Sequence, residues 1–207
     1  MARIELWNGD ICDLEVDAIV SPANTSLWMA TGVAGELKRT GGDQIEFAAI
    51  RQGPVRLGEA IVTPAGKLAA KVVIHAVSLE RDRRTSAEAI ESAVRSALAR
   101  VRELGLASVA FPALGTGIGG FPLADAARIT VRTIRDELAS PSSIDHVVLA
   151  LRGAAAYHAF AEALAALGTS PPAEGDSASG WRSVGPGGQA PVTPAAPVPA
   201  RRPEGEA

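Results

Sequence analysis

Apolar residues in the first 168 positions recur with two different periods, which separate expected strands from expected helices. Short apolar and β-branched runs predict strands at residues 3–7, 16–20, 59–63, 71–77, 107–111 and 144–151. Longer segments with apolar residues at helical spacing predict helices at residues 32–40, 43–51, 85–104, 123–138 and 155–167. Because strands and helices alternate, with one hairpin around Pro64-Ala65-Gly66, we expect an α/β fold, a three-layer α/β/α sandwich around a mixed, mostly parallel sheet.

Prolines and capping residues set the expected boundaries of these elements. The strand at 16–20 should stop at Ser21-Pro22, because proline has no N–H for a sheet ladder. Asp43 is the expected N-cap of the second helix, and Thr85 is expected to open the third.

The strand expected at 107–111 is followed by a loop with four glycines, at positions 115, 117, 119 and 120, and then by a helix. Glycine lets backbone N–H groups approach an oxyanion closely, and the positive end of the following helix adds its field. The segment therefore predicts a phosphate-binding loop. An ordinary flexible surface turn is the alternative.

Ligands of such sheets bind at the carboxyl ends of the strands. Four strand ends are therefore expected to face one crevice: residues 8–10, 21–24, 151–153 and the loop after Phe111. A second glycine segment, residues 31–35, begins a helix soon after Asn24. Two helix N-termini with glycine-rich entries suit a diphosphate better than a single phosphate.

Residues 169–207 differ in composition from the rest of the chain, since Pro, Gly, Ala and Ser dominate and Trp181 is the one aromatic residue. Such a segment buries too little apolar surface to offset its chain entropy. We therefore expect one folded domain at 1–168 and a disordered tail at 169–207.

Charge and cysteine content exclude several classes of function. The net charge of −3 and the lack of a Lys/Arg cluster argue against DNA or RNA as a partner. A lone cysteine and three scattered histidines make a poor metal-ligand set. No signal peptide or membrane-spanning run is evident. We expect a cytoplasmic monomer without a metal, a cofactor or a membrane partner.

Five short motifs carry a family resemblance by their order and spacing. They are Gly9-Asp10-Ile11, Asp17-Ala18-Ile19-Val20, Ala23-Asn24, Gly32-Val33-Ala34-Gly35 and Gly115-Thr116-Gly117-Ile118-Gly119-Gly120-Phe121-Pro122. Together they resemble the macrodomain family over essentially residues 1–168. The resemblance implies an α/β/α sandwich that binds ADP-ribose. Some members of that family remove ADP-ribose from proteins or deacetylate O-acetyl-ADP-ribose.

The resemblance also implies roles for single residues. Asp10 would accept a hydrogen bond from the adenine amino group, with the Ile11 N–H beside it. Asn24 would hydrogen-bond the distal ribose and is the candidate catalytic residue. Phe121 would pack on the sugar, and Arg152 would stack on the adenine. The diphosphate would be held by main-chain N–H groups of Gly32, Val33, Gly115, Thr116, Gly117, Ile118 and Gly119.

Simpler structural roles remain open for these residues. Asp10 and Asn24 are also typical of turns, Phe121 of an ordinary core and Arg152 of a solvated strand end.

Three departures from the family pattern bear on activity. Ser21 replaces a frequent Asn, the segment 28–31 is bulkier than the usual glycine run, and Ala34 stands where one hydrolase branch has an aspartate. We therefore expect ADP-ribose binding with slow hydrolysis of ester-linked mono-ADP-ribose from proteins, or deacetylation of O-acetyl-ADP-ribose. A non-catalytic ADP-ribose reader is the alternative.

A second alternative is a dinucleotide-binding oxidoreductase. Gly115-x-Gly117-x-x-Gly120 matches the dinucleotide fingerprint, and Arg152 could meet the 2′-phosphate of NADP. Prolines on both sides of the glycines and the lack of an acidic residue at the end of the next strand make this the weaker hypothesis.

Overall fold

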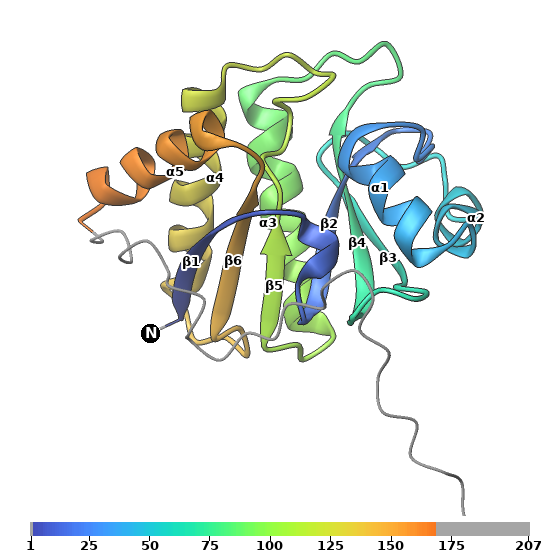
Figure 1. The fold of residues 1–207 in the computed structure, drawn as a ribbon, viewed down its shortest axis with the longest axis horizontal. Helices are drawn as coiled ribbons and strands as arrows, with labels where there is room; N and C mark the ends of the chain where they lie inside the picture. Colours follow the sequence, from blue (N-terminus) through green and yellow to red (C-terminus); the bar gives the residue numbers. More distant parts are fainter. Residues whose placement is uncertain (1, 169–207) are drawn as a thin grey trace, which may run out of the picture.

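A computed structural model describes residues 2–168, and within them six strands and five α-helices alternate along the chain (Figure 1). The strands are β1 (Arg3–Asn8), β2 (Val16–Asn24), β3 (Ala60–Pro64), β4 (Ala70–Leu79), β5 (Ser108–Phe111) and β6 (His146–Leu151). The helices are α1 (Gly32–Gly41), α2 (Gln44–Ile50), α3 (Ala87–Glu103), α4 (Leu123–Leu138) and α5 (Ala154–Ala166), with a short 3-10 helix η1 (Ile11–Asp13). The tail predicted at 169–207 lies outside the described residues.

The strands form one sheet in the order β1-β6-β5-β2-β4-β3. Neighbouring strands are parallel except β3 and β4, which form the predicted antiparallel hairpin. The mixed, mostly parallel sheet is therefore confirmed. Its order differs from the 3-2-1-4-5-6 order of the dinucleotide-binding fold, so the NADP hypothesis loses its structural basis.

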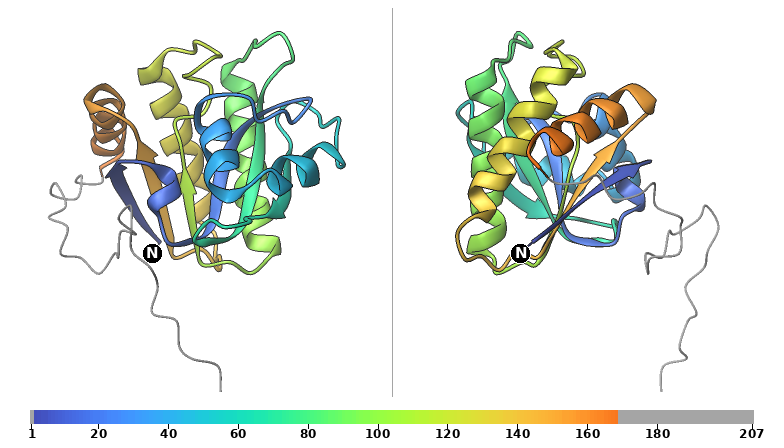
Figure 2. Two further views of the ribbon diagram at one scale, coloured as in Figure 1. Left: turned by 45° about the vertical axis from the view of Figure 1, so that its right-hand side comes forward. Right: turned by 90° about the vertical axis from the view of Figure 1, so that its left-hand side faces the viewer.

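Helices cover both faces of the sheet, which confirms the three layers (Figure 2). Along β2 the side chains alternate, as a strand requires. Ala18 and Val20 pack into the core under α3, α4 and α5, whereas Ile19 packs into the core under α1 and α2. All three are fully buried, so β2 is a central strand with apolar cores on both sides. No helix within residues 2–168 is long and apolar enough to cross a membrane.

The end predicted for β2 at Ser21-Pro22 is wrong, because the strand continues to Asn24. Pro22 pairs in register with Ala76 of β4, but β2 pairs with β5 only at Ala18 and Ile19. The last part of β2 is thus paired with β4 alone, and its other side is open. A missing N–H costs no ladder hydrogen bond on that open side.

Two predicted helix starts have different outcomes. Asp43 stands at the N-cap position of α2, as predicted, but its side chain makes no capping hydrogen bond. The third helix begins at Ala87 rather than Thr85, because the Ser86 hydroxyl caps it by accepting from the Ala89 N–H at 3.1 Å. The Thr85 hydroxyl instead donates to the Ser78 carbonyl at 2.6 Å and joins this turn to β4.

Buried His75 of β4 should make the fold sensitive to acid. Its Nε2 lies 2.9 Å from the Thr63 hydroxyl, and burial lowers the pKa of His75 from 6.5 to about 4. The unfolded chain therefore binds a proton between pH 6.5 and 4 that the folded chain does not, so stability falls with falling pH in this window. We expect a loss of about 3 kcal/mol in the free energy of unfolding.

Chemical denaturation at several pH values would measure this loss. His75→Gln keeps a hydrogen-bonding group near Thr63 and has no proton to bind, so its stability should change less over the same window. An equal loss in both proteins would assign the acid sensitivity to other groups.

Candidate functional site

The residues predicted to form the site lie along one edge of the sheet. Strands β1, β6, β5 and β2 are neighbours and run parallel, so their carboxyl ends share an edge, which we call the carboxyl edge. Asp10 follows β1, Arg152 follows β6, the glycine loop follows β5 and Asn24 ends β2. The row spans three strand spacings, roughly 14 Å, which suits an elongated ligand.

Asp10 and Arg152 are brought together at the β1 end of this row. The Asp10 Oδ1 atom accepts from the Cys12 N–H at 3.0 Å and caps η1, while Oδ2 pairs with the Arg152 guanidinium at 2.5 Å. The turn role considered for Asp10 is therefore real. The N–H of Ile11 donates to no group within residues 2–168 and is therefore available to a ligand. Arg152 is paired with Asp10 but largely exposed, so a ligand can reach its guanidinium.

Cys12 is no candidate nucleophile beside this pair. Burial, together with the neighbouring Asp10 carboxylate, raises the pKa of the Cys12 thiol to about 12. A thiol with that pKa stays protonated at neutral pH and is unreactive.

The glycine loop after β5 has a run of free donors. It is held by the Phe121 N–H donating to the Gly115 carbonyl and by the Gly120 N–H donating to the Gly117 carbonyl. Within residues 2–168, the four consecutive N–H groups of residues 116–119 donate to no partner. Gly115 has φ +78°, a conformation that favours glycine. A row of free backbone N–H groups in a turn is suited to an oxyanion.

The N-terminus of α1 supplies a second set of donors. The first N–H groups of α1, at Gly32 and Val33, have no intrahelical acceptor, as at the start of any α-helix, and the Thr31 side chain does not cap them. Gly32 has φ +62°, and a Cβ added there would meet no atom within 4 Å. The backbone is therefore open to a ligand at this point, where the helix dipole favours negative charge.

Asn24 is anchored in its own loop. Its Oδ1 accepts from the Ser26 N–H at 2.9 Å, and its Nδ2 donates to the Trp28 carbonyl at 3.4 Å. The turn role is thus present here too. One Nδ2 hydrogen and part of the Oδ1 acceptor capacity remain for a ligand hydroxyl.

The Asn24 loop and the glycine loop converge on Leu79 at the end of β4. The Leu79 carbonyl accepts from the Thr25 N–H at 3.1 Å. A Cβ on Gly119 would lie 2.6 Å from the Leu79 side chain, so glycine is needed for this close approach. Phe121 is half-buried and packs against the core under α3, α4 and α5, as the core interpretation expects.

No ionisable side chain of α1 takes the place of the missing aspartate within the described helix. Ala34 is buried in the core under α1 and α2, and Glu36, two residues further along α1, is paired with Arg39. Ser21 is fully buried in β2. Within residues 2–168, no three His, Cys, Asp or Glu side chains gather as a metal site would need, and the expectation of a metal-free protein stays a prediction.

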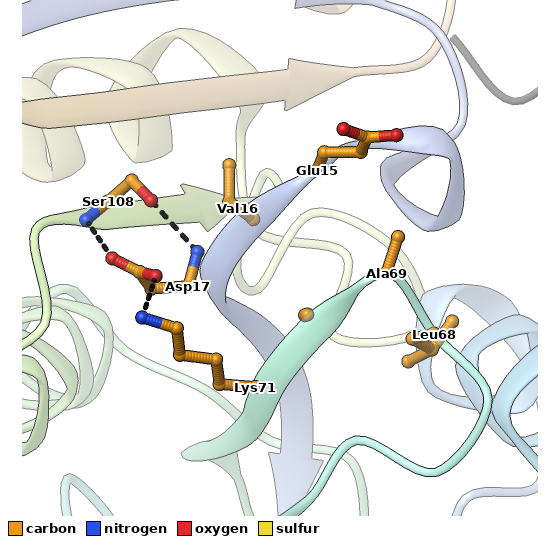
Figure 3. Close-up of a pocket in the computed structure, with 8 residues that line it drawn as sticks. Glu15, Val16, Asp17, Leu68, Ala69, Lys71 and Ser108 are labelled. Atoms are coloured by element: carbon orange, nitrogen blue, oxygen red, sulfur yellow. Dashed lines mark hydrogen bonds and ion pairs between the residues drawn. The ribbon is translucent and has the colours of Figure 1, made fainter. Parts of the chain in front are cut away.

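A hollow of about 420 Å³ lies at the opposite, amino edge of the sheet (Figure 3). One of its two acidic side chains, Asp17, is paired with Lys71 at 2.7 Å and accepts from the N–H groups of Ala107 and Ser108. The Ser108 hydroxyl accepts from the Asp17 N–H at 2.8 Å. These polar groups satisfy one another's hydrogen bonds and link β2 to β4 and β5. Their role is therefore structural, and the hollow lies at the edge of the sheet opposite the predicted site.

Comparison with known proteins places the chain in a family. Residues 20–130 match the family model described as Macro domain. An uncharacterized protein of Mycobacterium tuberculosis is 43% identical over 166 residues, covering 80% of this chain and 46% of that protein. An O-acetyl-ADP-ribose deacetylase of Salmonella gallinarum is 42% identical over 141 residues, covering 65% of this chain and 79% of that protein.

A solved structure supports the same conclusion. The Trypanosoma brucei macrodomain in complex with ADP-ribose superimposes with a TM-score of 0.73 at 28% identity, covering 78% of this chain and 68% of that one. The present chain spans about half the length of the mycobacterial relative. With the sheet order and the two glycine loops, these matches show that the chain belongs to the macro domain family.

Proposed function

We propose that this protein binds ADP-ribose along the carboxyl edge of its sheet. The observation that carries the proposal is the run of unpartnered N–H groups at residues 116–119, together with the uncapped N-terminus of α1. The two donor sets follow neighbouring strands, which supports the proposal that together they hold the two phosphates of one diphosphate. The Trypanosoma brucei relative was solved with ADP-ribose, which supports the same ligand class.

The order of residues along the edge matches the order of groups in this ligand. At the β1 end, Asp10 and the Ile11 N–H receive the adenine, and Arg152 stacks on its face. The glycine segments take the diphosphate in the middle. At the β2 end, Asn24 hydrogen-bonds the distal ribose and Phe121 packs on it.

We further propose slow hydrolysis of an ester at the distal ribose, either to an acidic protein side chain or to an acetyl group. A water oxygen bonds to the acyl carbon, the bond from that carbon to the ribose oxygen breaks, and the ribose oxygen takes a proton from the water. Asn24 orients the ribose, the ligand's own phosphate holds the water, and loop N–H groups stabilise developing charge. The deacetylase of Salmonella gallinarum supports this reaction class.

Slow turnover is expected because no protein carboxylate is assigned as a general base. That contribution is typically worth about 10²–10⁴-fold in rate. Buried Ala34, at the position of the missing aspartate, is the observation that favours the alternative of a non-catalytic reader. The cytoplasmic location and the monomeric state stay predictions.

Two measurements on the full chain test the proposal. Calorimetry should detect ADP-ribose binding and no comparable binding of NADPH. Incubation with O-acetyl-ADP-ribose, and separately with a glutamate-ADP-ribosylated protein, should release acetate or ADP-ribose. Binding without release would support the reader, and absence of binding would contradict the proposal altogether.

Removing the Asp10 carboxylate should weaken ADP-ribose binding measurably. We expect Asp10→Ala to lose about 1.5–3 kcal/mol of binding free energy, the usual value for a hydrogen bond to a charged group. Asp10→Asn is the matched control, because its amide oxygen can still cap η1 through the Cys12 N–H. If the Asn variant keeps full affinity while the Ala variant loses it, the role of Asp10 is to shape the loop rather than to bind adenine.

A further inference from the structure

Glu46 of α2 is a buried carboxylate with a partner for each oxygen. The residue is 6% exposed. Its Oε1 accepts from the Met29 N–H at 2.7 Å, and its Oε2 pairs with Lys38 Nζ of α1 at 3.1 Å. A buried carboxylate is costly unless it is paired in this way. Glu46 therefore joins α2 and α1 to the loop of residues 25–31.

The peptide group that Glu46 holds is also the group that Asn24 contacts. The Met29 N–H and the Trp28 carbonyl belong to one peptide unit, which is planar. Glu46 accepts from its N–H side at 2.7 Å, and the Asn24 Nδ2 donates to its carbonyl side at 3.4 Å. The hydrogen bond from the Met29 N–H to Glu46 therefore fixes the plane of this peptide. The plane in turn sets the direction of the Trp28 carbonyl, to which the Asn24 amide donates.

The loop needs such a hold because its backbone is strained. Leu27 has φ +62°, which a bulky residue rarely adopts. The Leu27 side chain is buried with Ala49 of α2. Without the Glu46 contact, the peptide following Trp28 would lose its hydrogen bond in a buried place and would turn to find another.

We propose that Glu46 is a positioning residue that sets the orientation of the Asn24 amide through the peptide between Trp28 and Met29. This role rests on the proposed function, because it concerns the distal-ribose end of that site. Glu46 touches no ligand itself. It makes the site selective for the distal ribose over ligands that end at the diphosphate.

The test compares ADP-ribose with ADP, which lacks the distal ribose. Glu46→Ala removes the acceptor for the Met29 N–H, and Glu46→Gln keeps one. Asp17→Ala is the matched control, since it removes an equally well-paired carboxylate at the amino edge. For each full-length variant the measurements are the thermal midpoint, the two dissociation constants and the exchange rate of the Met29 amide proton.

We expect Glu46→Ala to lower the preference for ADP-ribose over ADP by up to about tenfold, the scale of one hydrogen bond between neutral groups such as the Asn24 amide and a ribose hydroxyl, with ADP affinity kept. Its Met29 amide should exchange at least about tenfold faster, because it loses a hydrogen bond to a charged group. Glu46→Gln should lie nearer the unmodified protein in both readouts. Asp17→Ala should lower the thermal midpoint and leave the preference unchanged.

Two outcomes would overturn the inference, and they differ from failure of the proposed function. Equal losses for ADP and ADP-ribose in Glu46→Ala would mean a general structural role. An unchanged preference would mean that the Asn24 amide does not depend on Glu46. If the unmodified chain bound no ADP-ribose, the proposed function would fall first, and the ribose role of Glu46 with it.

Discussion

Gly32→Glu should abolish measurable ADP-ribose binding. The new carboxylate would stand at the N-terminus of α1, where a phosphate is proposed to lie. Two negative charges brought side by side in a binding site cost several kcal/mol. A Cβ at this position meets no atom within 4 Å, so the side chain starts in open space. We expect at least a 100-fold rise in the dissociation constant measured by calorimetry, which is about 2.7 kcal/mol.

Gly32→Ala separates charge from backbone strain. Both variants place a Cβ at φ +62°, a conformation that costs an L-residue roughly 1–2 kcal/mol. The Ala variant should therefore share the loss of thermal stability and keep most of the affinity. Similar affinity losses in both variants would show that the loop conformation, rather than the charge, is responsible. Unchanged affinity in Gly32→Glu would contradict the proposed position of the phosphate at the N-terminus of α1.

The order of the elements could be predicted because each signal is local. Apolar runs of period two and segments of helical period are read within a few residues, and α4 begins and ends where its pattern predicts. The end of β2 could not be predicted in this way. Whether Pro22 breaks a strand depends on how far β5 extends beside it, which is a property of the sheet.

The candidate site also combines features that are local in the sequence with features that arise only in the folded sheet. Topology alone brings Asp10 and Arg152 together, because β1 and β6 become neighbours only in the folded sheet. The sequence indicated both residues without indicating that they pair. Glu46 was missed, since a glutamate in a short amphipathic helix reads as a solvated charge, and only the fold shows that it is buried beside Met29.

Hydrolysis should depend on Asn24 more than binding does. The amide is the one side chain proposed to orient the distal ribose, and a misplacement of about 1 Å in a reacting group can cost 10²-fold in rate. We expect Asn24→Ala to lower kcat by about 100-fold for release of acetate from O-acetyl-ADP-ribose, while KM changes less. The measurement is steady-state release of acetate by both proteins over the same series of substrate concentrations.

Asn24 also shapes its loop, so a second variant is needed to assign the loss. In Asn24→Ser the hydroxyl can still accept from the Ser26 N–H and form the same kind of turn, but it is too short to replace the amide at the ribose. Loss of activity in both variants would place Asn24 on the substrate. Recovery in the Ser variant would make Asn24 a loop-forming residue, and activity unchanged in both would leave the ADP-ribose reader as the function of this site.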